Sequence, residues 1–533
     1  MKFKKFKLTE NEYEHIKSTL KREPSDFELH LFSATYSEHC SYKHSKELLK
    51  LLPREVGPNK AIFYEENAGG VEIGDHAILF KMESHNHPCA VEPFNGAATG
   101  IGGIIRDVLA MNARPIALCN SLKFGSDKRI IKGVVSGISN YGNSIGVPTI
   151  STEVILDECY TQNPLVNVTA IGIARKSDIL TSSTAKSGMK LMLVGSNTMR
   201  DGMGGAAFAS KKLSDDPNED KLSIQIANPF MKKKLIEACL DIFSKKLVVS
   251  CQDCGAAGIL SSTSEVAFKS DCGVKIDLSK IHIGDNSIED FEIMLSETQE
   301  RMLFVVEEDK IFEIAQILKK FALAYSVIGE TIENKKYVIK NGEKVLADLP
   351  TELLVTPPKV DLDFRGGIGN MKEETGNGKR ETGGSSSPFT LHSSHIYEQY
   401  DHTVGGRTQF QPCENPQFNS LWIYEENCYL GVYTFSVVIE NEPFESLKEG
   451  LLTASKALKE LGYKPIGLTN CLNFANPEIA PTMFEFRETI LAIKNACEEI
   501  QIPVCSGNVS FYNEYNGGKI KNTPTFTILG LKR

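Results

Sequence analysis

Two stretches of the chain, ARPIALCNSLKF at residues 113–124 and YKPIGLTNCLNF at residues 463–474, share one pattern and decide how the fold is organised. Each carries a basic residue before Pro-Ile, continues through a small residue to Leu, and ends on Leu-x-Phe. Pro115 and Pro465 set the offset between the two stretches at 350 positions. Chance alone can produce one such match, so the flanking sequence decides whether it marks a repeat.

Two further matches follow in the same order. The segment IGVPTIS at 145–151 is similar to IQIPVCS at 500–506, and VTAIGIAR at 168–175 is similar to FTILGLKR at 526–533. Three ordered matches with a slowly growing offset indicate an internal duplication of whole domains rather than a solenoid of short repeats.

The duplication predicts how the chain divides into domains. After Arg175 the first copy continues into a second domain, whereas after Arg533 the second copy stops. A chain of 533 residues is expected to hold about three to four domains. We therefore expect an N-terminal helical segment (1–50), a first N domain, N1 (51–180), a C domain, C1 (181–360), a flexible linker rich in Gly and Ser (361–398), and a second N domain, N2 (399–533), with no second C domain, C2.

Composition narrows the class of protein. Hydrophobic residues make up 41% and charged residues 24% of the chain, as in ordinary globular proteins. The net charge of −9 argues against a nucleic-acid binder, and no apolar run is long enough to span a membrane. The basic N-terminus lacks the apolar region of a signal peptide, and the thirteen cysteines follow no framework spacing. These features predict a cytoplasmic protein with free thiols.

Hydrophobic periodicity predicts both helices and strands. Helical spacing occurs at Tyr13, Ile16 and Leu20, and again over 311–318 and 447–458. Strand-like patterns occur over 77–83 and 166–171. Their alternation along the chain predicts an α/β or α+β fold.

The stretches KMESHNHP at 81–88 and GAATGIGGIIRD at 96–107 concentrate the chemistry. We interpret the glycines as a turn that leads into a helix and lets backbone N–H groups approach an anion. Glu83 and Asp107 offer oxygen ligands to a hard cation, and Arg106 offers a fork for a phosphate or carboxylate. These residues indicate a phosphate-and-magnesium site, although each could instead be structural. Neither a dinucleotide fingerprint nor a P-loop is present.

The CQDC motif at 251–254 has two interpretations. A redox or zinc site would fit a C-x-x-C pair, but no second pair and no thioredoxin-like context accompany it. The favoured interpretation is two small buried residues that flank a functional Asp253, followed by a tight turn into a helix at 255–258.

Several blocks together resemble the synthetase subunit of phosphoribosylformylglycinamidine synthase, of the small bacterial type, an enzyme family of purine biosynthesis. The blocks appear in the family's order over most of residues 37–514. They are SEHCSYK at 37–43, ESHNHP at 83–88, GGIIRD at 102–107, RDGMGG at 200–205 within 195–210, QDCGAAG at 252–258, ETQERM at 297–302 and SGNVSFYNE at 506–514.

The resemblance implies a reaction and a fold. Formylglycinamide ribonucleotide, ATP and ammonia would give formylglycinamidine ribonucleotide, ADP and phosphate through a phosphorylated amide, with Mg²⁺ as cofactor. The fold would be that of the aminoimidazole-ribonucleotide-synthetase superfamily, in which the sheets of N1 and N2 pair into a barrel-like core and the α/β domain C1 packs outside. Because no glutaminase nucleophile elbow is apparent, the resemblance also implies a separate glutaminase subunit and a small bridging subunit.

The resemblance assigns roles residue by residue. It implies catalytic roles for His39 and for His85, the latter as proton acceptor; ATP contacts for Tyr42, Lys81, Asn470 and Gly507; magnesium ligands at Glu83, Asp107, Asp253 and Asn508; and substrate contacts for Ser84, His85, Asn86, His87, Arg106, Gln225, Glu297, Thr298, Gln299 and Ser510.

Departures from the family pattern keep alternatives open. The segment 408–461 is divergent, Thr298 replaces a usual Ser, and Asn470 stands where Asp is frequent. One alternative is another enzyme of the superfamily, which the length, the duplication and the SEHCSYK block disfavour. The other is a truncated or decayed non-catalytic homologue that binds nucleotide without turnover.

Overall fold

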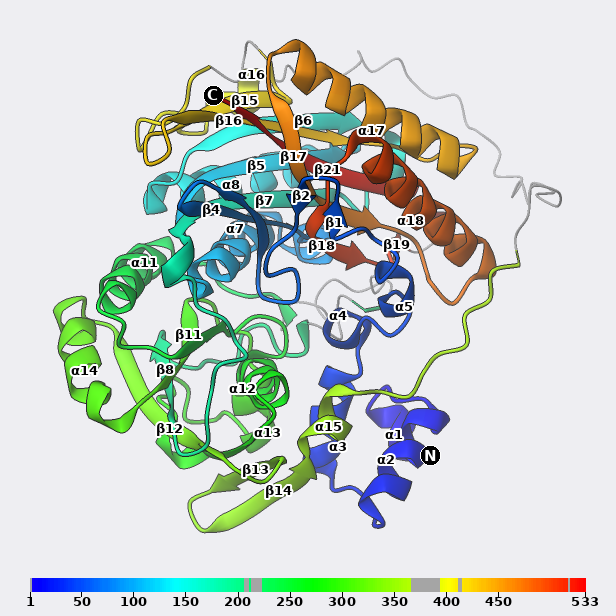
Figure 1. The fold of residues 1–533 in the computed structure, drawn as a ribbon. Helices are drawn as coiled ribbons and strands as arrows, with labels where there is room; N and C mark the ends of the chain where they lie inside the picture. The colour runs from blue at the N-terminus through cyan, green and yellow to red at the C-terminus, as the bar shows by residue number, and fades with distance from the viewer. Residues whose placement is uncertain (1, 206–209, 212–222, 366–393, 411–414, 516–517) are drawn as a thin grey trace.

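Three large sheets organise the protein (Figure 1). The structure is a computed structural model that describes residues 2–205, 210–211, 223–365, 394–410, 415–515 and 518–533. Two of the sheets have five strands each, and the third has seven. The two five-stranded sheets hold the repeat found in the sequence, and the seven-stranded sheet lies between them in chain order.

The two five-stranded sheets have the same strand order. The first is β3-β4-β7-β5-β6 and the second is β15-β16-β21-β17-β18. Their bounds are β3 (Gly69–Ile73), β4 (His76–Ser84), β7 (Leu165–Arg175), β5 (Arg114–Phe124) and β6 (Thr149–Leu156), and then β15 (Phe418–Ile423), β16 (Cys428–Ser436), β21 (Thr523–Lys532), β17 (Lys464–Asn473) and β18 (Val504–Ser510).

Irregularities in the two sheets also coincide. The pairing of β5 with β7 shifts register just after Pro115, and that of β17 with β21 shifts just after Pro465. A second shift falls after Leu118 and after Leu468 in the pairing with β6 and β18. Because β-bulges are defined features of a fold, their recurrence at an offset of 350 confirms the predicted duplication.

The two repeated sheets pack face to face. Their shared core is apolar, and at its centre Thr169 and Thr527, which are equivalent positions, join their hydroxyls at 2.9 Å. A pseudo-two-fold axis therefore passes between these two threonines. The buried core side chains include Val71, Ile78, Phe80, Ile116 and Ile171 from the first sheet and Leu421, Leu430, Val432, Ile466 and Leu529 from the second. This arrangement confirms the expected pairing of N1 and N2.

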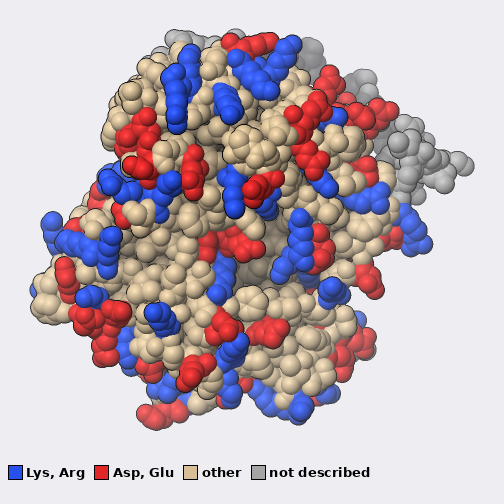
Figure 2. All heavy atoms as spheres, viewed as in Figure 1, with Lys and Arg blue, Asp and Glu red and all other residues tan. Residues whose placement is uncertain are grey.

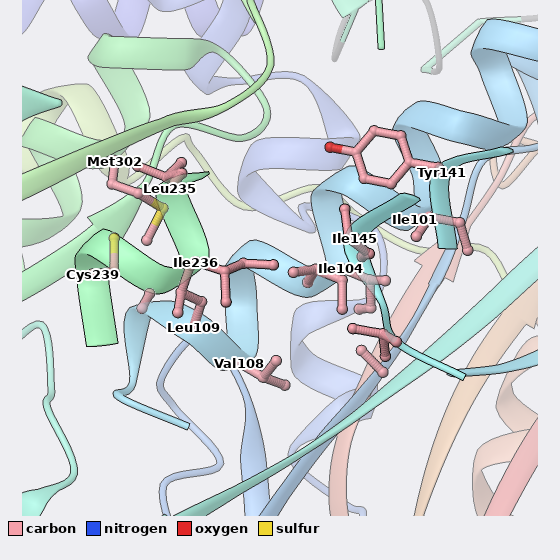
Figure 3. Close-up of a cluster of buried hydrophobic side chains, with 14 of the residues drawn as sticks. Ile101, Ile104, Val108, Leu109, Tyr141, Ile145, Leu235, Ile236, Cys239 and Met302 are labelled. Carbon is pink, nitrogen blue, oxygen red and sulfur yellow. The ribbon is translucent and has the colours of Figure 1, made fainter. Parts of the chain in front are cut away.

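Helices cover the outer faces of the paired sheets. α7 (Pro93–Ala110) and α8 (Lys128–Ile145) pack on the first sheet, and α17 (Pro443–Glu460) and α18 (Ala480–Ile500) pack on the second (Figure 1). α7 is buried along most of its length because α8 lies on one side of it and α11 (Pro229–Ser244) on another. Figure 3 shows the side chains that join these three helices, among them Ile104 and Leu109 of α7 and Ile236 of α11.

The glycine-rich stretch at 96–103 does not form the predicted turn. It lies inside α7, which begins at Pro93. A Cβ at Gly96 would lie 2.5 Å from the carbonyl carbon of Pro88, and one at Gly102 would lie 2.7 Å from the Tyr141 hydroxyl. The prediction of an anion-binding loop is therefore wrong, because these glycines serve close packing of α7 against α6 (Asn86–Val91) and α8.

The seven-stranded sheet lies outside the paired sheets, with strand order β14-β13-β10-β12-β8-β11-β9. α11 and α14 pack on one face, whereas α12, α13, α15 and the N-terminal helices pack on the other. The strands are β8 (Lys190–Gly195), β9 (Ser250–Asp253), β10 (Gly273–Asp277), β11 (Arg301–Val306), β12 (Ala324–Ile332), β13 (Lys336–Asn341) and β14 (Lys344–Pro350). The helices are α12 (Gly258–Lys269), α13 (Asp290–Leu295), α14 (Ile311–Lys320) and α15 (Thr351–Val355).

The N-terminal segment is helical, as expected from its periodicity. Capping boxes start its two longer helices: Thr9 pairs with Glu12, and Ser25 pairs with Glu28. The helices are α1 (Lys2–Lys5), α2 (Glu10–Leu20), α3 (Asp26–Thr35), α4 (Glu38–Ser41) and α5 (Lys46–Leu49). The chain also has short elements, among them β1 (Glu55–Val56), β2 (Asn59–Lys60), α16 (Ser394–Tyr397), β19 (Glu514–Tyr515) and β20 (Gly518–Lys519).

The predicted strands over 77–83 and 166–171 are β4 and β7, and the predicted helices over 311–318 and 447–458 are α14 and α17. Most of the predicted linker, 361–398, lies outside the described residues. None of the described helices has the length and apolar character needed to cross a membrane.

Candidate active site

The alternation of β4 separates its polar side chains between two faces. Odd-numbered positions such as Leu79 pack toward the helices, and even-numbered ones such as Phe80 pack toward the second sheet. Lys81 and Glu83 therefore face α7, whereas Ser84 faces β18. The strand thus supplies polar side chains to two adjoining walls of one site.

Lys81 lies between two carboxylates. Its Nζ is 2.8 Å from Oε1 of Glu83 and 3.0 Å from Oδ2 of Asp107, which comes from α7. Burial disfavours the ammonium, but the two carboxylates outweigh it and hold the pKa of Lys81 well above its ordinary value. Burial and the charge of Glu83 raise the pKa of Asp107 well above its ordinary value. One cation therefore compensates two acidic groups incompletely.

Arg106, next to Asp107 on α7, points toward C1. Its Nε donates to Oδ2 of Asp253 at 3.2 Å, and its Nη1 donates to Oε1 of Gln299. Gln299 donates onward to Gln225, whose Nε2 donates to Oε2 of Glu297 at 2.8 Å. Five predicted site residues therefore form one continuous chain of hydrogen bonds at the contact between N1 and C1.

Asn86 forms the corresponding contact between N1 and N2. Its Nδ2 donates to Oδ1 of Asn473 at 2.9 Å, to Oδ1 of Asn513 at 2.9 Å and to Oγ of Ser510 at 3.1 Å. Its Oδ1 accepts from the backbone N–H of Val166 at 2.8 Å. All of the hydrogen-bonding groups of this amide are engaged, so Asn86 fixes the start of α6 against N2.

Ser84 makes a second bridge to N2. Its hydroxyl donates to Oδ1 of Asn508 at 3.0 Å. Ser84 and Asn508 were predicted as a substrate contact and a magnesium ligand, and the structure brings these two side chains together.

Two histidines beside β4 have hydrogen bonds to backbone carbonyls, which fix their tautomers. Nδ1 of His85 lies 2.6 Å from the carbonyl oxygen of Gly96, and Nε2 of His87 lies 3.1 Å from that of Tyr512. Because a carbonyl oxygen only accepts, Nδ1 of His85 carries the proton and its Nε2 presents a lone pair when the ring is neutral. Burial lowers the pKa of His85, which favours this neutral form.

His39 approaches the same region from α4. Its Nδ1 is 3.0 Å from Oγ of Ser210, which also accepts from the backbone N–H of His39 at 3.3 Å. Burial, with the nearby rings of His87 and His85, lowers the pKa of His39 to about 4. His39 is therefore a neutral imidazole at physiological pH.

Three predicted ATP contacts lie around this region. Tyr42, in the left-handed conformation that ends α4, has its pKa raised to about 12 by burial, and Lys81, Glu83 and Asn508 also act on it. Asn470 on β17 pairs with Gly507 on β18, and a Cβ at Gly507 would lie 2.7 Å from Oδ1 of Asn470. Nδ2 of Asn470 is buried without a hydrogen-bond partner among the described residues.

Thr298 points away from the others. Its hydroxyl bonds to Asp201 and accepts from the backbone N–H of Met199 at 3.0 Å, so it braces the loop that follows β8. Its neighbours Glu297 and Gln299 belong to the chain from Arg106 described above.

The CQDC motif fits the favoured interpretation. Cys251 and Cys254 are free and buried, and burial raises the pKa of both thiols. Asp253 between them pairs with Arg106. Ala257 and Gly258 both adopt positive φ as the chain turns into α12, as predicted for this segment.

The acidic residues match the chemistry of Mg²⁺ without forming a preformed cage. Within the described ranges, no three His, Cys, Asp or Glu side chains converge as metal ligands. The pKa of Asp107 is nevertheless raised by burial, Glu83 and Asp253, so negative potential is concentrated there. Carboxylate and amide oxygens are ligands that Mg²⁺ accepts, and it usually keeps several waters. Glu83, Asp107, Asp253 and Asn508 therefore fit a magnesium bound largely through ATP.

Several residues of this region were missed by sequence reasoning. Asn473 and Asn513 surround Asn86, Ser210 contacts His39, and Lys232 donates to the carbonyl oxygen of Gly102 at 3.0 Å behind Arg106. Asn473 carried a signal, because it aligns with Lys123 as a strongly polar difference near the end of the repeated stretch, and Ser210 and Asn513 lie within the blocks at 195–210 and 506–514 that carry the family resemblance. On the molecular surface, acidic and basic side chains are interspersed, and the face in Figure 2 is hollowed near its centre.

Family models match three parts of the chain. The N-terminal domain of AIR synthase related proteins matches residues 65–174 and 458–531, which confirms the duplication independently. The C-terminal domain of the same proteins matches residues 186–341. The linker domain of formylglycinamide ribonucleotide amidotransferase matches residues 2–43.

Named relatives match nearly the whole chain. It is 44% identical to phosphoribosylformylglycinamidine synthase subunit PurL of Petrotoga mobilis, with 98% of this chain and 73% of the relative covered. It is 42% identical to the subunit of that name from Carboxydothermus hydrogenoformans, with 99% and 74% covered.

Solved structures of PurL from Thermotoga maritima have the same fold. The complex with FGAR superposes with a TM-score of 0.85 at 37% identity, covering 98% of this chain and 83% of that one. The complex with ATP gives 0.79 at 34% identity, covering 98% and 82%. A PurLQS assembly gives 0.83 at 36% identity, covering 97% and 82%.

Proposed function

The chain belongs to the family of phosphoribosylformylglycinamidine synthase subunit PurL, and we propose that it converts formylglycinamide ribonucleotide, ATP and ammonia into formylglycinamidine ribonucleotide, ADP and phosphate. One observation carries the proposal: Lys81, Glu83 and Asp107 meet where N1 contacts both C1 through Arg106 and N2 through Asn86. These groups all belong to N1, and their hydrogen-bond partners Asp253 and Ser510 come from C1 and N2.

The domain division proposed for this function is the one expected from the repeat. The N-terminal helices, N1 (51–180), C1 (181–360) and N2 (399–533) would act as one unit. Three separate sheets support this division, as does the polar contact of N1 with each of the other two domains.

The first chemical step places the γ-phosphoryl group of ATP on the amide oxygen of the substrate. That oxygen attacks phosphorus, the bond to ADP breaks, and the amide N–H gives up its proton. An iminophosphate results, which has a good leaving group where the amide had a poor one. Positioning and charge neutralisation account for most catalysis of phosphoryl transfer.

Lys81 is placed to neutralise charge that develops on the transferred phosphoryl group. We assign Tyr42, Asn470 and Gly507 to ATP, and the orphaned Nδ2 of Asn470 supports this because a buried donor without a partner suits a ligand acceptor. Mg²⁺, held through Glu83, Asp107, Asp253 and Asn508, would supply further neutralisation of the phosphate oxygens.

The substrate would lie along the chain of hydrogen bonds that starts at Arg106 and along the contacts of Asn86 with N2. Arg106 offers a fork for its phosphate, and the amide of Gln299 donates to that of Gln225 a hydrogen bond that a ligand can replace. The remaining proposed substrate contacts are Ser84, Asn86, His87, Glu297, Thr298 and Ser510. The phosphate contact is the strongest of these assignments chemically, because Arg106 is buried and already oriented by Asp253.

His85 is the proposed proton acceptor. Its neutral ring presents the Nε2 lone pair, because Nδ1–H is held by the carbonyl oxygen of Gly96. His39, also neutral, is proposed to handle the proton released when ammonia adds to the imidate carbon and phosphate leaves with the former amide oxygen. Replacement of His39 by Ala should then abolish synthesis and leave ATP binding largely intact.

The ammonia is proposed to come from a glutaminase subunit joined by a small bridging subunit. The PurLQS assembly of the relative supports a multi-subunit arrangement. A second candidate function is that of a non-catalytic nucleotide-binding homologue, which the divergent segment 408–461 favours.

The deciding experiment is phosphate release by the purified chain with formylglycinamide ribonucleotide, ATP, Mg²⁺ and concentrated ammonium, which bypasses the glutaminase. We expect phosphate release that needs both the ribonucleotide and ammonium. Asp253→Asn is expected to raise the Mg²⁺ concentration at which phosphate release is half-maximal. Calorimetric binding of Mg·ATP without any ribonucleotide-dependent phosphate would establish the non-catalytic alternative instead.

A further inference from the structure

Lys123 is a fully buried lysine at the contact between N1 and N2 that the proposed reaction does not use. It lies near the end of β5, and none of its side chain reaches solvent. Its Nζ donates to Oγ of Ser121 at 2.6 Å, to Oγ1 of Thr525 at 2.7 Å and to Oδ1 of Asn167 at 3.3 Å. Burial of an ammonium is costly, so its retention calls for a specific reason.

A chain of three side-chain amides leads from Lys123 to the candidate active site. Asn167 and Asn473 exchange hydrogen bonds through both of their amide groups, at 3.1 and 3.2 Å. Oδ1 of Asn473 also accepts from Nδ2 of Asn86 at 2.9 Å. The chain therefore ends on the residue that begins α6, between His85 and His87.

The ammonium sets the orientation of the first amide in this chain, that of Asn167. It has only donors, so the oxygen of Asn167 must face it and the nitrogen of Asn167 must face Asn473. That nitrogen in turn requires the oxygen of Asn473, which leaves this oxygen to accept from Asn86. A neutral or accepting group at position 123 would remove this constraint on Asn167, which acts together with the backbone groups of Thr523 and Val166 that hold Asn473 and Asn86.

The repeat shows that this lysine is particular to one copy. Lys123 aligns with Asn473, so the two members of a pseudo-symmetric pair have become an ammonium and an amide in one network. The carboxylate of Glu153 balances the charge of Lys123 on the side away from the amides. Its Oε2 is 4.0 Å from Nζ of Lys123, and its Oε1 accepts from the backbone N–H of Ser436 and from Gln417. Glu153 can thus be changed without touching the amides.

We propose that Lys123 is a positioning residue, which orients the amide chain Asn167–Asn473–Asn86 and thereby holds the start of α6 in the geometry that binds the ribonucleotide substrate. This inference rests on the proposed function. It predicts an effect on the ribonucleotide rather than on ATP, because Asn86 and its neighbours belong to the substrate wall.

The protonation of Lys123 offers a test in the unaltered protein. Burial lowers the pKa of Lys123 to about 8, against the opposing effect of Glu153. The titratable groups that face it are Glu153 from β6 and Cys471 from β17, and burial raises the pKa of that thiol to about 12. Lys123 thus loses its proton between pH 7 and 9.

The experiment measures KM for the ribonucleotide and for ATP separately. Lys123→Met is expected to raise KM for the ribonucleotide about tenfold, the effect of losing an oriented hydrogen-bond network, and to change KM for ATP less than about twofold. Glu153→Gln is the matched control, because it removes the ion pair and leaves the amides: it should lower thermal stability and leave both KM values unchanged. In the wild type, KM for the ribonucleotide should rise from pH 7 to 9.

Three results would overturn the proposal. The first is unchanged KM for the ribonucleotide in Lys123→Met. The second is an equal rise of both KM values, which a general loss of structure would cause. The third is a KM for the ribonucleotide that stays constant from pH 7 to 9 in the wild type. If Lys123→Met fails to fold, this pH series and the double variant Lys123→Met/Glu153→Gln test the proposal in its place. A wild type without any turnover would instead contradict the proposed function itself.

Discussion

β4 and β16 occupy the same place in the two copies of the repeat, yet their side chains differ in kind. On β4, Lys81 and Glu83 are the cross-strand partners of Ala170 and Val168 on β7. On β16, Tyr433 and Phe435 pair across from the equivalent residues of β21. Both pairs face the covering helices, so one copy turns charged groups toward its helix and the other turns aromatic rings.

The helices repeat the contrast. α7 and α17 stop at the same distance before their following strands, so Asp107 is equivalent to Ala457. Ser84 donates to Asn508, and the equivalent Ser436 donates to Glu153 at 2.5 Å. The backbone arrangement is thus shared, and within the repeat the charged side chains of the site, Lys81, Glu83 and Asp107, lie in one copy. Fold and site are separable within this single chain.

The comparison is tested most severely at Asp107 and its counterpart. Asp107→Asn should lower ammonium-dependent turnover by about a thousandfold, because it removes a carboxylate assigned to the Mg²⁺ that neutralises the transferred phosphoryl group. Ala457→Ser, at the equivalent position of the other copy, should leave turnover within about twofold of wild type, as is typical of a mild surface change. Steady-state phosphate release measures both, and comparable losses in the two variants would contradict the assignment of the charged groups of the site to the first copy.

Ser84→Ala and Ser436→Ala form a second matched pair. Ser84→Ala should raise KM for the ribonucleotide about tenfold, the effect of one lost hydrogen bond near the substrate. Ser436→Ala should leave kinetics unchanged and lower the melting temperature, since it removes a donor from the buried carboxylate of Glu153. Kinetics and thermal melting of both variants check this, and exchanged effects would contradict it.

Acid titration sharpens the comparison, because His39, His85 and His87 all lie beside the charged copy. The unfolded chain takes up a proton on His39 near pH 6.5, whereas burial lowers its folded pKa to about 4. Between these values the unfolded state binds more protons, so stability falls as pH drops from 6.5 to 4.

The melting temperature of the His39→Gln variant should therefore fall less than that of the wild type over that range, and the difference between the two falls should be about 3 °C. Thermal melting at pH 7 and pH 4.5 measures the difference. Identical losses in the two proteins would show that His39 is not held in its neutral form.

The smallest expected effect lies on the pseudo-symmetry axis. Thr169→Val and Thr527→Val each remove one hydroxyl of the same pair, and each should lower stability by about 1 kcal/mol. Because the two residues share their interaction, the double variant should lose less than the sum. Denaturant unfolding checks this, and strictly additive losses would show that the two hydroxyls act independently.

The repeat itself could be predicted from sequence, because the two copies keep Pro-Ile at 115–116 and 465–466, and a β-branched residue before Pro148 and Pro503. Glu83 and Asp107 could also be singled out, since carboxylates offer oxygen ligands to a hard cation, and Lys81 could be singled out from the family resemblance. The role of Gly96 could not, because a glycine inside a tightly packed helix looks like a turn glycine until its neighbours are known.

The links between domains were equally hidden. The contact of Arg106 with Gln299 joins residues nearly two hundred positions apart, and that of Asn86 with Asn473 joins residues still farther apart. Such contacts depend on how the three sheets dock, which is a tertiary property that no local pattern carries. For the same reason Lys123 looked like an ordinary basic residue of the repeat.

The most direct test of the account follows the amide oxygen. The ribonucleotide is labelled with ¹⁸O at its glycinamide carbonyl, and phosphate from turnover with ATP, Mg²⁺ and ammonium is analysed by mass spectrometry. If that oxygen is phosphorylated at the Lys81 site and leaves with phosphate, each phosphate released carries one ¹⁸O atom. Product formed together with unlabelled phosphate would contradict the proposed mechanism.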